Sequence, residues 1–363
     1  MHTSVKEWQT GQVERITTEY EKAFGESSTA GLDSIPPYID EQSLREMYDR
    51  LENVRDSVSV RVLWLGSFDV HFSVLDLGYE RPGKKTYVLL GGAVSSIDAL
   101  KVIGVPLAAL GHRVVMTPHV MNGDVCVRSH KCGADFARDY YRLDRALGAF
   151  FPDGDVMAEI LKVLHEQERL FGKVCLVGMS TGAAVMLRAA EAIMNPKNNM
   201  PELLDGLVLI SPAGSFPTRV TKGLKRRVEA MRLGSGFLRE STSARFDPIE
   251  WLIQIEDAGI PARDFARDGP RLLLRCISSV LHEVASKLRL PITVVCGRQD
   301  NAIPYGLLQE AISEVNALRR ENCIPDINTI VHNQGNHAWS CQAGAMVAHI
   351  MNSVKFHNEV SDI

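Results

Sequence analysis

KVCLVGMSTGAA, residues 173–184, joins a short apolar run to a stretch rich in alanine. The run before Gly178 is typical of a buried strand, and residues 182–194 are typical of a helix. Between them, GMSTG fits the pattern G-x-S-x-G, in which a serine occupies a sharp strand-to-helix turn. The glycines at positions 178 and 182 leave room for the strand and the helix to approach each other. Because the same letters also suit a plain turn, the rest of the chain decides whether Ser180 is a nucleophile.

Strands and helices alternate in this way along most of the chain. We expect strands at residues 59–65, 70–77, 86–90, 112–118, 173–177, 206–211, 291–297 and 326–332. Most of them are short and apolar throughout, which is typical of strands buried on both faces of a mostly parallel sheet. The first two, separated by GSFD, suit a hairpin that adds antiparallel strands at one edge. The fold class we predict is α/β, with a doubly wound sheet flanked by helices.

A long polar segment after residue 118 leads to helices expected near 134–149 and 155–170, and the last helix is expected at 341–355.

Two segments do not follow this alternation. Residues 3–24 show apolar residues at helix-like intervals, residues 25–38 are a linker rich in Gly, Ser and Pro, and a second helix is expected from Asp40, which can cap it, to about Val54. Residues 1–57 therefore predict an N-terminal helical extension. Residues 213–290 lie between two expected strands and look helical, so we predict an inserted cap there. The core then comprises residues 58–212 and 291–363.

Composition excludes several classes of protein. The 363 residues are 45% apolar and 23% charged, which suffices for a sizeable core. The net charge of −4 argues against a nucleic-acid binder, because such proteins usually carry a basic excess. No apolar run approaches the roughly 18 residues of a membrane span, and the first twenty residues lack the apolar core of a signal peptide. We therefore expect a cytoplasmic protein that acts on a small molecule and has no integral membrane segment.

Cysteines and glycine motifs give no sign of a metal or a nucleotide cofactor. The seven cysteines are scattered, and several lie in apolar runs, which favours reduced thiols in the core; they are Cys126, Cys132, Cys175, Cys276, Cys296, Cys323 and Cys341. Zinc sites usually show two closely spaced ligand pairs, and only the region of Cys126 and Cys132 approaches this pattern. Neither a P-loop nor G-x-G-x-x-G occurs.

A nucleophilic serine needs a base and an acid that orients the base. When a serine occupies such a turn, the chain order is serine, acid, histidine. Among the four histidines between Ser180 and residue 355, only His337 lies in a loop, HNQGNHAW, between an expected strand and the last helix; the others are His282, His332 and His349. Asp300 follows the strand PITVVCG at the carboxyl edge of the sheet, where ligands gather in open α/β sheets. A surface histidine and a turn-forming aspartate are the plainer interpretations of these two positions.

Acyl transfer also requires N–H donors for the developing oxyanion. One donor is expected at Thr181, directly after the serine. The other is expected in LLGGAVSS, the loop after the strand 86–90, which places Gly92 and Ala93 there. Small residues in this loop let the backbone come close to a substrate.

In their order along the chain, these pieces resemble the α/β-hydrolase superfamily over about residues 60–355: the strand before Gly91 and Gly92, then GHRVVMTP, GMSTG, LISPAG, VVCGRQDNAIP and GNHAW. The resemblance implies an α/β-hydrolase fold with a helical cap that shapes the acyl or alcohol pocket. It also implies functional residues: Ser180 as nucleophile, Asp300 as acid, His337 as base, Ala93 and Thr181 as oxyanion donors, and Gly92 as a lesser contributor. The chain departs from many members in having Gly91 where they have a histidine before the oxyanion glycine.

The resulting hypothesis is a serine hydrolase that cleaves a carboxylic ester or thioester and needs no cofactor. Acyl transfer to another acceptor, carbon–carbon bond hydrolysis and a ligand-binding protein without turnover remain alternatives, since a fold does not fix a function.

The expected cap contains a basic stretch, TRVTKGLKRRVEAMR, residues 218–232. Its cations are Arg219, Lys222, Lys225, Arg226, Arg227 and Arg232. A solvated helix face accounts for them, and the alternative is a basic rim that attracts an anionic acyl substrate. For the N-terminal extension we consider three roles: packing over an edge of the sheet, covering the pocket, and joining copies of the chain into a homo-oligomer.

Overall fold

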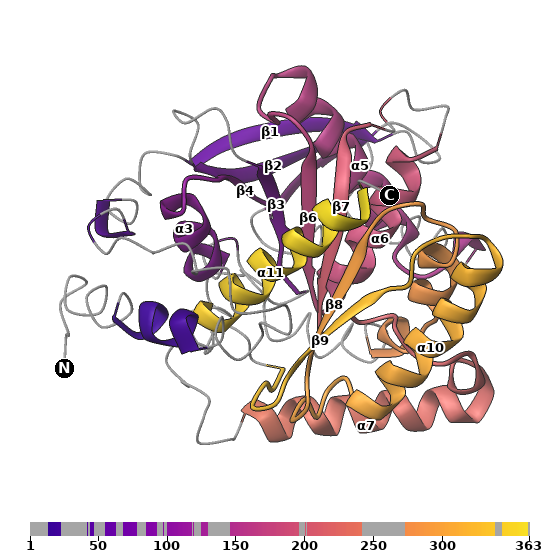
Figure 1. Ribbon diagram of the computed structural model, residues 1–363. Helices are drawn as coiled ribbons and strands as arrows, with labels where there is room; N and C mark the ends of the chain where they lie inside the picture. The colour runs from indigo at the N-terminus through magenta and orange to yellow at the C-terminus, as the bar shows by residue number, and fades with distance from the viewer. Residues whose placement is uncertain are drawn as a thin grey trace.

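The computed structural model describes most of the expected core and part of the two additional segments (Figure 1). The described residues are 14–22, 42, 44–46, 55–62, 68–77, 85–92, 97, 100–117, 119, 125–129, 146–195, 200, 202–241, 273–337 and 343–361. Among the predicted features, Ala93, Cys132, the linker at 25–38 and most of the helix near 134–149 lie outside these residues.

Nine strands in the described part of the chain form one sheet, in the order β1-β2-β4-β3-β6-β7-β8-β9, with β5 paired to β2. They are β1 (Arg55–Val62), β2 (Phe68–Leu77), β3 (Thr86–Leu90), β4 (Arg113–Thr117), β5 (Val125–Ser129), β6 (Val174–Met179), β7 (Leu204–Ile210), β8 (Ile292–Gly297) and β9 (Asn328–His332). Neighbours from β4 to β9 are parallel, whereas β2 is antiparallel to β1, β4 and β5. The predicted α/β fold with a mostly parallel sheet is therefore confirmed.

Alternate side chains of each central strand enter two separate cores. In β3, Val88 and Leu90 belong to one core, and Tyr87 and Leu89 belong to the other. Because successive side chains in a strand point to opposite faces, a strand covered on both sides must be apolar throughout. This explains why the central strands could be recognised from their unbroken apolar runs.

Helices cover both faces of the sheet (Figure 1). The longer ones are α3 (Lys101–Ala109), α5 (Phe151–Glu166), α6 (Thr181–Ile193), α7 (Gly223–Ser241), α10 (Tyr305–Glu321) and α11 (Ala343–Ser361). One core contains side chains of α5, α6 and α10. The other contains those of α3 and α11, together with Ile16 and Tyr20 of the N-terminal helical segment.

Most strand boundaries agree with the sequence-based expectation within two residues, and the expected hairpin is present as β1 and β2. The strand β5 was not predicted, because it lies within the long polar segment after residue 118. It pairs with β2 from Phe72–Val125 to Phe68–Ser129. The last helix also extends to Ser361, beyond its expected end.

The described parts of the two additional segments are helical. Residues 14–22 form a helix, and the segment after β7 contains a short helical turn, Thr218–Val220, followed by α7 and by the π-helical turn η5 (Leu281–Ala285). The division into extension, core and cap stays a prediction. Among the described residues, no helix combines the length and the apolar character that crossing a bilayer requires.

Candidate active site

Ser180 lies in a strained turn between β6 and α6. Its backbone has φ 52° and ψ −119°, a conformation that L-residues rarely adopt. The N–H of Ser180 donates to the carbonyl of Ile210 (2.9 Å), and its own carbonyl accepts from the N–H of Ala213 (2.9 Å). These bonds attach the turn to the end of the neighbouring strand β7. The strained conformation is thus held by the sheet edge itself.

The two glycines of GMSTG are required by close backbone contacts. A Cβ on Gly178 would lie 2.5 Å from Cα of Ala183, inside the first turn of α6. A Cβ on Gly182 would overlap the carbonyl oxygen of Gly91 and lie 2.6 Å from that of Leu90. The helix therefore starts directly against the end of β3. This contact brings the loop that begins at Gly91 and Gly92 next to the turn of Ser180.

Two of the three expected oxyanion donors belong to the described residues. Gly92 is buried at the end of β3, and Thr181 is buried in the first turn of α6. N–H groups of a first helical turn have no acceptor within the helix, so they are available to a ligand. Ala93 lies outside the described residues.

Asp300 follows β8 in a turn that fixes both of its carboxylate oxygens. Oδ1 accepts hydrogen bonds from the N–H groups of Ala302 (2.9 Å) and Ile303 (2.7 Å). Oδ2 lies 3.0 Å from Nδ1 of His337. The side chain of Asp300 is 1% exposed, so these contacts replace water around the carboxylate.

His337 connects the aspartate to the serine. Its Nδ1 faces Asp300, and its Nε2 lies 3.0 Å from Oγ of Ser180. The side chain is 8% exposed, in a loop whose position is set by the neighbouring turn after β8. The N–H of Gln299 donates to the carbonyl of Gly335 (2.9 Å), and the N–H of Arg298 donates to that of His332 (3.0 Å). The structure therefore brings Ser180, His337 and Asp300 into one hydrogen-bonded row.

Two of the other histidines after Ser180 occupy a different place. Nε2 of His349 lies 3.3 Å from Nδ1 of His332, in a pair formed by α11 and the end of β9. Burial lowers the pKa of His349 to about 3, and the neighbouring His332 adds to this effect. His349 is therefore a neutral side chain of the core at physiological pH.

A buried ion pair near the same edge was not predicted. Nη2 of Arg275 lies 2.5 Å from Oδ2 of Asp153 in the first turn of α5, and its guanidinium stacks on Phe150 at 4.4 Å. The next residue, Cys276, accepts a hydrogen bond from the N–H of Gly214 (2.9 Å), just beyond the segment bonded to Ser180. The ion pair thus fixes the inserted segment to the core close to the serine turn. No sequence signal could have paired two residues 122 positions apart.

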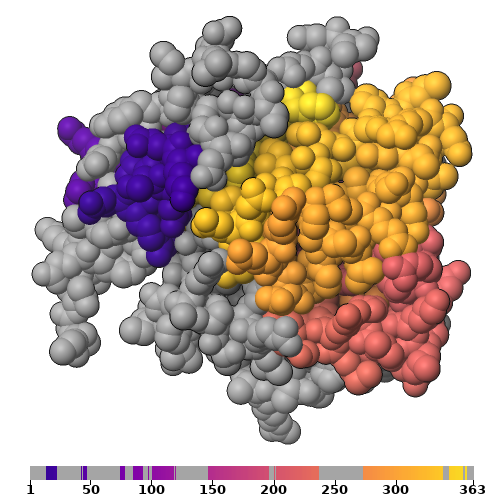
Figure 2. All heavy atoms as spheres, turned by 60° about the horizontal axis from the view of Figure 1, so that its bottom comes forward, coloured from indigo at the N-terminus to yellow at the C-terminus, as the bar shows by residue number. Residues whose placement is uncertain are grey.

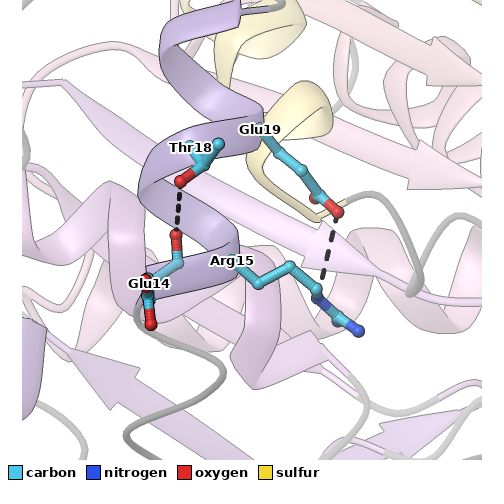
Figure 3. Close-up of a pocket in the computed structure, with 4 residues that line it drawn as sticks. All are labelled: Glu14, Arg15, Thr18 and Glu19. Carbon is cyan, nitrogen blue, oxygen red and sulfur yellow. Dashed lines mark hydrogen bonds and ion pairs between the residues drawn. The ribbon is translucent and has the colours of Figure 1, made fainter.

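A surface hollow away from this row already has its charged groups close together. No group of three or more His, Cys, Asp or Glu side chains in the described part of the chain is arranged to hold a metal ion. A shallow hollow of roughly 310 Å³ lies on the helix of residues 14–22 (Figure 3). Its charged groups already face each other, since Nε of Arg15 lies 3.9 Å from Oε1 of Glu19. Thr18 donates to the carbonyl of Glu14 (2.9 Å).

Burial keeps the thiols of the described core cysteines in their protonated form. It raises the pKa of Cys175, Cys276 and Cys296 to about 12 each, so these thiols stay protonated. Cys323, by contrast, is exposed at the end of α10, where the sequence had suggested a core thiol.

Comparison with known proteins supports the fold. The model of the alpha/beta hydrolase family matches residues 94–340, a range that contains Ser180, Asp300 and His337. Among solved structures, a bromoperoxidase from Bacillus anthracis is 15% identical, with 83% of this chain and 100% of that chain covered and a TM-score of 0.54. A hydrolase from Oleispira antarctica is 12% identical, with 78% and 94% covered and a TM-score of 0.52. No curated protein matches the sequence. At these identities, the structural likenesses concern the fold alone.

Proposed function

The chain belongs to the alpha/beta hydrolase family, and from this premise we propose that it is a serine hydrolase that cleaves a carboxylic ester or thioester through an acyl-enzyme on Ser180. The row of hydrogen bonds from Ser180 through His337 to Asp300 carries this proposal, because both distances are 3.0 Å. A nucleophile, a base and an orienting acid within hydrogen-bond reach are the arrangement that activates a serine hydroxyl.

In the first step, Oγ of Ser180 attacks the carbonyl carbon of the substrate. Nε2 of neutral His337 takes the hydroxyl proton as the new C–O bond forms. Asp300 accepts a hydrogen bond from Nδ1, which keeps the free lone pair on Nε2 and stabilises the imidazolium. The tight hold on Asp300 by two backbone N–H groups keeps the carboxylate in place during this transfer.

The oxyanion that forms is stabilised by backbone N–H groups of Thr181 and Ala93, with Gly92 as a lesser contributor. Supporting this role, the start of α6 lies directly against the end of β3. Removing a single donor of this kind typically costs about 10²–10³ in kcat. Collapse of the intermediate breaks the bond to the alcohol or thiol, which takes the proton from Nε2. Water then enters, gives a proton to Nε2 and cleaves the acyl-enzyme by the same route.

Labelling with a fluorophosphonate probe tests the nucleophile directly. The wild-type protein should be labelled, and Ser180→Ala should lose the label together with turnover of p-nitrophenyl esters, by about a million-fold in kcat. Ser211→Ala is a matched control, because Ser211 also follows a strand of the carboxyl edge with a positive φ of 42°. Equal labelling of wild type and Ser180→Ala would remove the basis of the proposal.

A panel of esters and thioesters of increasing chain length then separates the alternatives. Hydrolysis predicts free acid as the product, whereas transfer to an added alcohol or thiol predicts a new ester or thioester. Labelling without turnover of any substrate in the panel would favour carbon–carbon bond hydrolysis or a binding function. Within this proposal, we place the protein in the cytoplasm.

A further inference from the structure

The outer face of α7 carries three exposed apolar side chains. Leu224 is 75% exposed, Val228 is 44% exposed and Met231 is 67% exposed. Their spacing of four and three residues places them on one side of the helix, and we call them the α7 stripe. The opposite side of the helix is buried through Ala230 and Leu233. Large apolar side chains gathered on one exposed face are a common feature of interaction sites.

Cations flank the α7 stripe on both sides. At 100° per residue, Lys225 and Arg232 lie on one side of it, and Arg227 lies on the other. Lys222 precedes the helix and is exposed. The side chains of Lys222, Lys225 and Arg227 form no ion pair or hydrogen bond with the described residues, whereas Arg232 pairs with Glu229 at 3.3 Å.

The other two cations of this stretch have structural partners. Arg219 pairs with both carboxylate oxygens of Glu310 on α10, at 2.5 and 2.6 Å. Arg226 donates to the carbonyl of Leu274 through two nitrogens. The structure therefore divides the basic stretch into cations that hold the inserted segment in place and cations that face outward.

The α7 stripe lies on the side of the molecule that contains the carboxyl edge of the sheet. A Cβ on Gly236 would overlap the carbonyl oxygen of Asn301 and lie 2.6 Å from its carbon, so α7 packs against the turn that contains Asp300. In Figure 1, α7 lies below the ends of β8 and β9. Figure 2 shows atoms of α7 forming part of the face turned toward the viewer.

We propose that α7 docks the protein on a bilayer surface that contains anionic lipids. Apolar side chains of an interfacial helix enter the boundary between headgroups and acyl chains, while flanking Lys and Arg contact anionic headgroups. Among the described side chains of α7, the face opposite the stripe is buried, so one face is open. One open face suits a planar surface, whereas a partner that encloses a helix needs more than one face. Because the whole chain has a net charge of −4, the attraction is local to this helix.

Docking through the α7 stripe turns the carboxyl edge of the sheet toward the membrane. This orientation adds an access route for acyl lipids if the serine hydrolase proposed above is correct. The docking itself does not depend on that activity, so the two proposals fail independently of each other.

Flotation with lipid vesicles tests the docking. The full chain should bind vesicles of phosphatidylcholine and phosphatidylserine at 0.1 M salt, and bind far less to vesicles of phosphatidylcholine alone or at 0.5 M salt. The triple variant Lys222→Gln, Lys225→Gln and Arg227→Gln should lower the partition coefficient by about a hundredfold, at about fivefold for each cation. Leu224→Ser with Val228→Ser and Met231→Ser should lower it by about tenfold or more.

Matched controls lie on other surfaces. Lys173, Lys287 and Arg289 are exposed before β6 and β8, and their replacement by Gln changes the net charge by the same amount. Leu147, which is 51% exposed, provides a control for the apolar substitutions. Both controls should bind as the wild type does, and unchanged thermal unfolding shows that every variant folds.

Wild-type protein that ignores phosphatidylserine, or α7 variants that bind vesicles as strongly as the controls, would overturn the proposal. Salt-sensitive turnover of a soluble anionic ester without vesicle binding would also overturn it, and would assign the cations to substrate attraction. Capture by a protein partner in the absence of vesicle binding would have the same consequence.

Discussion

The two edges of the parallel sheet both contain buried polar side chains, but they arrange them differently. At the carboxyl edge, Ser180, His337 and Asp300 come from three strand ends and form one continuous row. The serine at the end of that row has a strained backbone. Such strain persists only where surrounding structure fixes it, and it concentrates at functional sites.

At the amino edge, the buried polar groups interact with one another and with α11, and Oγ1 of Thr293 also accepts from Nδ2 of Asn328 (3.4 Å). Lys85 pairs with Asp205, and Oγ1 of Thr293 lies 3.2 Å from Nε2 of His357. Burial lowers the pKa of His357 to about 4 and raises that of Tyr87 well above its usual value. Shifted pKa values often identify functional sites, yet here they occur at the edge where none of the named residues has a strained, positive-φ backbone. Geometry is therefore the better guide to function in this molecule.

Replacing an aspartate by asparagine at each edge distinguishes a catalytic role at the carboxyl edge from a structural role at the amino edge. Asp300→Asn should lower kcat by about 10³–10⁴-fold, because the amide donates to Nδ1 of His337 and leaves the proton on Nε2, which can then no longer act as a base. The amide oxygen can still accept from Ala302 and Ile303, so the free energy of unfolding should change little. Ester turnover and thermal unfolding measure the two effects. If the variant keeps more than a tenth of the wild-type kcat, Asp300 does not orient His337 for catalysis.

Asp205→Asn should have the opposite profile. Lys85 is only 15% exposed, and it would lose the carboxylate that compensates its charge. Removing one partner of a buried ion pair typically costs about 3–5 kcal/mol of folding free energy. Because part of the Lys85 side chain reaches solvent, we expect the lower end of that range in urea unfolding. The kcat of the folded fraction should stay within twofold of wild type, and a large loss of kcat would show that the amino edge takes part in catalysis.

Much of this difference between the edges could be predicted from the sequence. Parallel strands place their carboxyl ends at one edge, so residues following the strands at 173–177, 291–297 and 326–332 were expected to meet there. Nearly unbroken apolar runs identified the strands at 173–177 and 291–297 because both sheet faces are covered there, whereas β9 is a half-buried strand at the end of the sheet. The family match and the observed fold confirm the predicted fold class and its mostly parallel sheet. The roles of the residues that follow these strands stay a prediction.

Contacts between distant segments could not be predicted in the same way. The strand β5 has no apolar run long enough to identify it, and its position depends on pairing with β2. The ion pair of Asp153 and Arg275 depends on how the inserted segment folds back onto α5. At the amino edge, Lys85 and Asp205 precede or begin strands without a recognisable motif. Their pairing follows from strand order rather than from local sequence.

The pH dependence of stability should reveal the buried histidine at the amino edge. His357 has a pKa of about 4 in the folded chain and about 6.5 when unfolded, so the unfolded state binds more protons between these values. Stability is therefore fully present above pH 6.5 and is lost as the pH falls toward 4, by at most about 3 kcal/mol from this group. His357→Gln should flatten the curve in this window. An unchanged pH dependence would show that His357 does not titrate this way.

The smallest predicted effect concerns α11, which begins just beyond His337 and reaches the amino edge at His357. The N–H of Gly344 in its first turn donates to Oε2 of Glu19 (3.3 Å), so a side chain from the helix of residues 14–22 caps it. A Cβ on Gly344 would overlap the carbonyl of Ile16 and lie 2.6 Å from the nitrogen of Tyr20, which explains why this position is a glycine.

Glu19→Ala should lower the free energy of unfolding by about 1 kcal/mol, the usual cost of losing a helix cap. Glu19→Gln should retain part of that stability, because its amide oxygen can still accept the hydrogen bond while the favourable charge at the helix start is lost. Arg15→Ala is the control, since it removes the ion pair with Glu19 but leaves the cap in place. Because α11 follows the loop of His337, we also expect kcat to fall slightly, by less than about threefold, in step with stability. A loss of kcat without any loss of stability would instead indicate that the N-terminal helix acts on the carboxyl edge directly.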